Sequence, residues 1–169
     1  MSTISIRKLL CLALIPLALL AACAGDESEE VTTSSDLALE CYLDGTAAME
    51  RFLLEKGRDC FVKALDEDPE FSMAWAHLSI AQRQLGEIEA AKESIQRAWE
   101  TRELASEVEA LWVTRLHAIF ERDQATAETA YQTMLERYPD HPWVLRLRAE
   151  YAKLQNDYDT ALACYDRLL

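Results

Sequence analysis

The stretch EDPEFSMAWAHLSIAQRQLGEIEAAKESIQRAW, residues 67–99, decides the fold of this 169-residue chain. Apolar residues recur in it at helical spacings on both sides of Gly86, a pattern typical of two amphipathic helices joined by a turn. The first helix carries the bulky Trp75, and the second carries the small residues Ala91 and Ala98. Because a large side chain needs a small one opposite it where two helices lie close together, the stretch predicts an antiparallel helical pair.

The same register recurs along the rest of the chain. With Ser72 as the start of one unit, it returns near Val108 and Pro142 and extends back to Ala38. From Asp36 onward no stretch alternates convincingly between polar and apolar residues. We therefore expect an all-α fold built from about four helical pairs.

The unit that follows Pro69 resembles a tetratricopeptide repeat (TPR). The resemblance lies in Trp75, Leu78, Gly86, Ala91, Ile95 and Ala98. It implies a right-handed superhelical TPR solenoid over residues 37–169, with helix-turn-helix repeats at about 38–71, 72–107, 108–141 and 142–169. The first repeat diverges most, since Cys41 stands where Trp is usual, and such divergence is expected of a terminal unit. An ordinary helical bundle is the alternative.

The resemblance also implies where partners bind. TPR domains generally hold peptides or partner helices on a concave side lined by the first helix of each repeat, at repeat positions 2, 5, 9, 12 and 13. These positions select a largely aromatic and apolar set as partner-binding residues: Tyr42, Met49, Met73, Ile80, Arg83, Trp112, Leu116, Phe120, Trp143, Arg146 and Lys153. Packing between repeats is the alternative role for each of them.

The identity of these residues indicates the kind of partner. The Lys and Asn set with which co-chaperone TPR domains clamp a carboxylate is not found at these positions, so recognition of acidic C-terminal tails is not predicted. We expect apolar or amphipathic protein segments, with Arg146 and Lys153 offering a local positive end. Residues 41–81 also resemble TPR regions attached to bacterial adenylate cyclases and regulatory kinases, a likeness that concerns the fold alone.

The N-terminus has the pattern of an export signal. Arg7 and Lys8 precede an apolar run at 9–22, which is too short to span a bilayer as a helix. The run ends in Leu-Ala-Ala-Cys, which resembles a bacterial lipobox and implies a signal peptide at 1–22 and a lipid on Cys23, where the mature chain would begin. Ordinary secretory cleavage or an uncleaved anchor are the alternatives.

The resemblance to a lipoprotein implies a place in the cell. Ala24 follows the cysteine where Asp would favour retention in the inner membrane, so the outer membrane facing the periplasm is expected. Residues 23–36 are polar and acidic without periodicity, which predicts a disordered linker between lipid and folded domain.

The charge and the scattered reactive residues exclude several functions. The formal net charge of −13 has the wrong sign for nucleic acid. The histidines, His77, His117 and His141, lie far apart in sequence, so no metal and no cofactor is predicted, and His77 reads as a packing residue. After export and lipidation, three cysteines would remain: Cys41, Cys60 and Cys164. We interpret them as small apolar core residues, with a Cys41–Cys60 bond as the less favoured alternative.

We expect this chain to be a non-catalytic scaffold for protein partners, anchored in the cell envelope by its lipid. One alternative is a regulatory TPR portion of a larger signalling or enzymatic protein. The other is a domain that binds or acts on a small molecule, which a closed pocket containing His77 or His117 would favour. Leu162, Leu168 and Leu169 are expected on an open apolar end, where further repeats or a partner would pack.

Overall fold

The computed structural model describes residues 31–169 of the chain. Every regular element within these residues is a helix, and they contain no strand. The α-helices are, in chain order, α1 (Asp36–Glu50), α2 (Leu54–Glu67), α3 (Ser72–Leu85), α4 (Ile88–Thr101), α5 (Glu107–Phe120), α6 (Gln124–Arg137), α7 (Pro142–Leu154) and α8 (Tyr158–Asp166). A 3₁₀ turn, η1 (Arg102–Leu104), lies between α4 and α5. The predicted signal peptide, the lipid site Cys23 and the linker as far as residue 30 lie outside the described residues.

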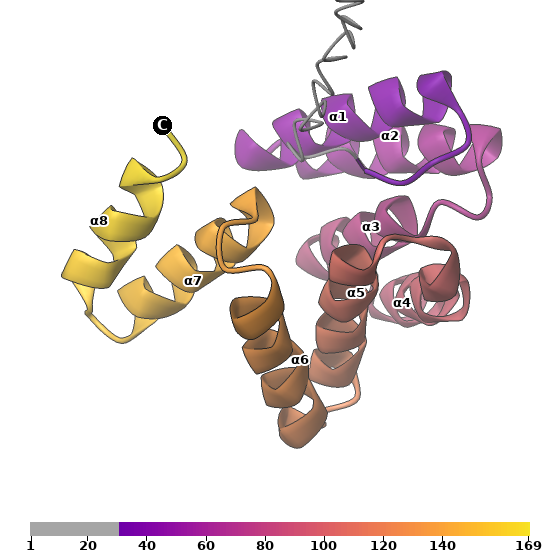
Figure 1. The fold of residues 1–169 in the computed structure, drawn as a ribbon. Coiled ribbons are helices and arrows are strands. Elements are labelled where there is room, and N and C mark those ends of the chain that lie inside the picture. Colours follow the sequence, from indigo (N-terminus) through magenta and orange to yellow (C-terminus); the bar gives the residue numbers. More distant parts are fainter. Residues whose placement is uncertain (1–30) are drawn as a thin grey trace, which may run out of the picture.

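Consecutive helices pair as the hairpins α1–α2, α3–α4, α5–α6 and α7–α8, which confirms the predicted helical-repeat solenoid (Figure 1). The backbone itself repeats. One residue in each hairpin turn has a left-handed conformation, at intervals of 34, 36 and 34 residues: Phe52, Gly86, Arg122 and Asn156. The longer middle interval includes the extra turn η1.

Small residues mark where the second helix of each hairpin meets the first. One buried position repeats through all four hairpins as Gly57, Ala91, Ala127 and Ala161. At Gly57, a Cβ atom would lie 2.8 Å from the sulfur of Met49, which is closer than van der Waals contact. At Gly45 on α1, a Cβ atom would lie 2.6 Å from the ring of Phe61. In the first hairpin, a fit of large against small residues therefore sets how closely the two helices pack.

The core is continuous through the first two hairpins and α5, while the fourth hairpin has a core of its own. Phe61, Met73 and Val113 belong to the larger cluster of buried residues. Leu145 and Cys164 belong to a separate cluster between α7 and α8. In Figure 1, α7 and α8 turn away from α6, so that the fourth hairpin joins the solenoid mainly through the N-terminal half of α7.

Residues 31–35, which we call the strap, lie against the solenoid ahead of α1. The backbone N–H and the hydroxyl of Thr32 donate to the two carboxylate oxygens of Glu109, at 2.8 and 2.5 Å. Glu109 is only 1% exposed and also accepts the N–H of Ser106, which closes the capping box at the start of α5. Val31 is buried as well. These contacts fasten the strap to the third hairpin.

Asp68, in the turn between α2 and α3, fastens the strap a second time. Its Oδ2 accepts the hydroxyl of Thr33 at 2.5 Å and the N–H of Ser34 at 2.9 Å, and its Oδ1 accepts the N–H of Glu70 at 3.1 Å. Burial alone would raise the pKa of Asp68, but these hydrogen bonds favour the ionised form and hold the pKa below its ordinary value. The strap thus bridges the first three hairpins.

The strap corrects the expectation of a disordered linker over residues 23–36. In the part of that segment that the structure describes, residues 31–35 are held by hydrogen bonds and Asp36 already belongs to α1. The polar composition of the segment suits a linker, but its hydroxyl and amide groups find buried carboxylates far along the chain. A buried carboxylate needs such donors, so the pairing stabilises both partners.

The remaining expectations concern the chain's end and its thiols. Leu162 and Leu169 are exposed, as expected, whereas Leu168 packs against the small core of the fourth hairpin. Cys164 is buried in that core, and Cys41 packs against the larger cluster. Both environments suit small apolar core residues. None of the helices between residues 31 and 169 has the length and hydropathy of a membrane span.

We predict that Asp68→Ala releases the strap. The substitution leaves donors from Thr33, Ser34 and Glu70 without their acceptor, which should lower the free energy of unfolding by about 2–3 kcal/mol. Amide hydrogen exchange followed by mass spectrometry should show faster exchange in residues 31–35. Asp66→Ala is the matched control, because Asp66 is exposed two residues earlier, near the end of α2. Unchanged exchange in the strap of the Asp68 variant would contradict this role.

Candidate functional site

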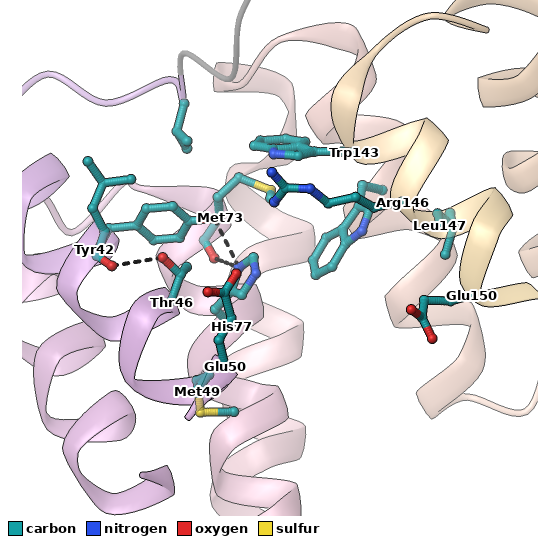
Figure 2. Close-up of a pocket in the computed structure, with 13 residues that line it drawn as sticks. Tyr42, Thr46, Met49, Glu50, Met73, His77, Trp143, Arg146, Leu147 and Glu150 are labelled. Carbon is teal, nitrogen blue, oxygen red and sulfur yellow. Dashed lines mark hydrogen bonds between the residues drawn. The ribbon is translucent and has the colours of Figure 1, made fainter. Parts of the chain in front are cut away.

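A cleft of about 370 Å³ lies between α1 and α7, with α3 and α5 at its base. First helices of all four hairpins therefore contribute to it, together with the strap. Its lining residues are Val31, Tyr42, Leu43, Thr46, Met49, Glu50, Met73, His77, Trp112, Trp143, Arg146, Leu147 and Glu150 (Figure 2). The cleft combines aromatic side chains with charged ones.

His77 on α3 is the centre of the cleft floor. Its ring stacks on Trp112 of α5, with centroids 5.0 Å apart and an interplanar angle of 6°. The ring of Tyr42 on α1 meets it edge-on at 5.2 Å, and Phe61 of α2 lies at 5.6 Å. Met73, one helical turn earlier on α3, is 1% exposed. The floor is therefore part of the core that joins the hairpins, not a surface added to it.

The hydrogen bonds of His77 fix its tautomer. Its Nδ1 lies 3.0 Å from the backbone oxygen of Met73, which only accepts, so Nδ1 carries the proton and donates (Figure 2). The hydroxyl of Tyr42 lies 3.3 Å from the same nitrogen. Burial lowers the pKa of His77 to about 4, although the bond to Met73 acts in the opposite direction. The imidazole is therefore neutral at physiological pH.

Charged side chains stand at the rim of the cleft on two opposite helices. Glu50 approaches from α1, and Arg146 and Glu150 approach from α7 (Figure 2). Glu150 accepts hydrogen bonds from Lys153 at 2.9 and 3.0 Å and from Tyr165 at 2.6 Å, and these bonds lower its pKa. An aromatic floor below a charged rim can hold an apolar group and select for the charge beside it.

The structure brings together six of the eleven predicted partner-binding residues. Tyr42, Met73, Trp112, Trp143 and Arg146 all line the cleft, as does Met49. Tyr42 and Met73 are almost fully buried, at 3% and 1% exposure, so they shape the floor from within the core. Trp112 and Trp143 are half-buried, so part of each side chain stays accessible.

The other five predicted residues lie outside the cleft: Ile80, Arg83, Leu116, Phe120 and Lys153. Leu116 and Phe120 pack against the larger core cluster, and the guanidinium of Arg83 covers the Phe120 ring at 5.3 Å. Lys153 forms its ion pair with Glu150 three residues earlier on α7. Of the two basic residues expected at a positive end, Arg146 lines the cleft and Lys153 does not.

Sequence reasoning missed several residues that line the cleft. Thr46, Glu50 and Glu150 occupy groove positions of their repeats. The prediction left them out because it kept only the apolar and basic residues at those positions. His77 falls beside those positions, and we predict it as a packing residue, with a closed pocket containing it as the sign of a small-molecule site. Val31 lies in the segment expected to be disordered, and no local signal pointed to it.

The remaining histidines have structural surroundings. His117 stacks on Trp99, with centroids 4.7 Å apart, and His141 accepts the N–H of Trp143 as the cap of α7. Among residues 31–169, no group of three or more His, Cys, Asp or Glu side chains is placed to hold a metal ion.

Comparisons with known proteins add little to this description. No family model matches the sequence, and no curated protein matches it. Among solved structures, the chain is similar to one titled "Crystal structure of MamA", with a TM-score of 0.43 and 17% sequence identity over 77% of this chain and 75% of that one. The assignment of a TPR-like repeat fold rests on the hairpins and intervals described above.

We predict that His77 makes the fold sensitive to mild acid. Below pH 6.5 the imidazole in the unfolded chain binds a proton, while the native imidazole does not until about pH 4. Stability should be complete above pH 6.5 and fall by on the order of 3 kcal/mol as the pH drops to 4. His77→Gln keeps a hydrogen-bond donor for the backbone oxygen of Met73. Its free energy of unfolding, measured in urea, should change clearly less between pH 7.5 and 4.5 than that of the wild type. An equal loss in both proteins would show that other groups dominate.

Proposed function

We propose that this chain is a non-catalytic scaffold of the bacterial cell envelope, anchored by a lipid on Cys23, that binds a segment of a partner protein in the cleft. The observation that carries the binding part is the meeting of four hairpins around one aromatic floor, with Trp112 and Trp143 half-buried in it. Tryptophans in partly desolvated pockets are the side chains that most often dominate the energy of protein interfaces.

The chemistry of the cleft supports binding in preference to catalysis. With a pKa near 4 and Nδ1 bonded to Met73, His77 is a weak base at neutral pH. Thr46, a second hydroxyl among the lining residues, donates to the carbonyl of Leu43 and so serves its own helix. Within the described residues, the cleft thus presents packing surface and charge, and no activated nucleophile.

The strap supports a position close to the membrane. Val31 is buried at the edge of the cleft, so the chain reaches the folded domain there. Seven residues lie between Cys23 and Val31, so the eight steps from one Cα atom to the other span at most about 28 Å when the chain is fully extended. With a lipid on Cys23, the cleft would therefore be held within roughly this distance of the bilayer, where it would meet membrane-associated partners first.

Binding of a small molecule is a second candidate, favoured by one observation. The cleft contains His77 at its floor, and its volume of about 370 Å³ falls at the lower end of the range for small-molecule sites. A small ligand would be recognised by stacking on Trp112 and Trp143. This candidate would be favoured if a small molecule raised the melting temperature of the protein and the crosslinking experiment below captured no partner protein.

A photo-crosslinking experiment tests the site of protein binding. A photo-reactive amino acid at Leu43, on the rim of the cleft, should give adducts with a partner in intact cells, whereas the same residue at Ile88, exposed on α4, should not. Trp143→Ala should reduce the Leu43 adducts about tenfold or more, since such anchors contribute about 2 kcal/mol. Equal adducts from both positions would contradict binding in the cleft.

A separate substitution tests the anchor. Cys23→Ser removes the thiol that the lipid would modify and should move the protein from the membrane fraction to the soluble fraction. Stable attachment to a membrane needs two or more acyl chains, and all of them would be carried by Cys23. Its replacement should therefore abolish membrane attachment. Cys41→Ser is the control, because Cys41 packs inside the folded domain. Retention of the Cys23 variant on membranes would rule out the lipid as the means of attachment.

A further inference from the structure

We infer that the cleft selects a basic, amphipathic segment: one apolar side chain enters the aromatic floor while flanking Lys or Arg residues meet the carboxylates at the rim. This inference rests on the proposed function, and it names the chemistry of the partner. Three properties of the described residues carry it: the depth of the apolar floor, the arrangement of charge at the rim, and the charge of the domain as a whole.

The floor requires an apolar group. Trp112 is stacked on a neutral imidazole, and that imidazole already has its proton bonded to the backbone of Met73. A charged or strongly polar group placed against these side chains would lose its hydration without gaining a partner. An aliphatic or aromatic side chain would instead bury surface on both sides, so it is the natural occupant of the lower half of the cleft.

The rim favours positive charge beside that apolar group. Glu50 and Glu150 stand on opposite walls, against the one cation Arg146 among the lining residues of the cleft. Arg146 already has an interaction of its own, and Glu150 is already paired with Lys153, so Glu50 is the rim carboxylate that carries the selection. Glu50 is exposed and accepts no hydrogen bond from any residue between 31 and 169. A Lys or Arg of the partner would pair with it directly.

The long-range field points the same way. Residues 31–169 hold 26 acidic and 15 basic side chains, a formal charge of −11. Such a domain attracts a basic segment from a distance and repels an acidic one, and the effect weakens as salt is added. An acidic tail is therefore disfavoured twice, by the field of the domain and by the carboxylates at the rim.

Two labelled peptides test this selection. Both have one helical face of Leu and Phe, and their polar faces carry only Lys in one and only Glu in the other. Binding is measured by fluorescence anisotropy with the full-length protein. The Lys peptide should bind at least about tenfold more tightly than the Glu peptide at low salt, and the difference should be smaller at high salt. Equal binding of both peptides would overturn the inference, and so would the absence of binding by either.

A matched pair of variants separates the rim from the overall charge. Glu50→Gln should weaken binding of the Lys peptide about threefold or more, while Glu136→Gln, on an exposed position of α6 outside the cleft, should change it less than twofold. Equal effects would mean that only net charge matters and would overturn a role for the rim. If the reagent at Leu43 crosslinks a partner but the protein binds the Lys and Glu peptides equally, the proposed function holds and this inference fails.

Discussion

The neutral imidazole of His77 is the contact on which the rest of the structure depends. It touches one aromatic ring from each of α1, α2 and α5, and its proton is bonded to the backbone of its own helix. Because the ring is flat and uncharged, Trp112 can stack on it and Tyr42 can meet its edge. The junction of three hairpins and the floor of the cleft are consequently one and the same set of contacts.

The repeat architecture could be predicted because it is a local property of the sequence. Small residues that recur every 34 to 36 residues, from Gly57 to Ala161, determine where two helices approach, and the two helices of each pair are close in the chain. Local signals were weaker in the turns. Phe52 and Arg122 adopt the left-handed conformation that Gly86 adopts easily, at about 1 kcal/mol each, because the packing of the flanking helices imposes it.

The strap and half of the cleft could not be predicted, since they depend on contacts between distant residues. The run of threonines and serines does not indicate that Glu109, 77 residues after Thr32, is buried and that its carboxylate requires hydrogen-bond donors. In the same way, the repeat register finds residues on the inner face of each helix but not how the fourth hairpin turns. The direction of the fourth hairpin sets α7 opposite α1. Leu116 and Phe120 pack against the larger core cluster and do not line the cleft.

Core and cleft impose different constraints on the residues they share. Met73 and Tyr42 are buried, so replacing them would disturb the junction of the hairpins before it altered any binding. Glu50 and Arg146 are exposed at the rim, where a substitution costs little stability. Specificity for a partner can therefore change through the rim alone while the floor stays fixed. A repeat protein that builds its floor from its core keeps an apolar pocket by necessity, and the charges around that pocket decide what enters it.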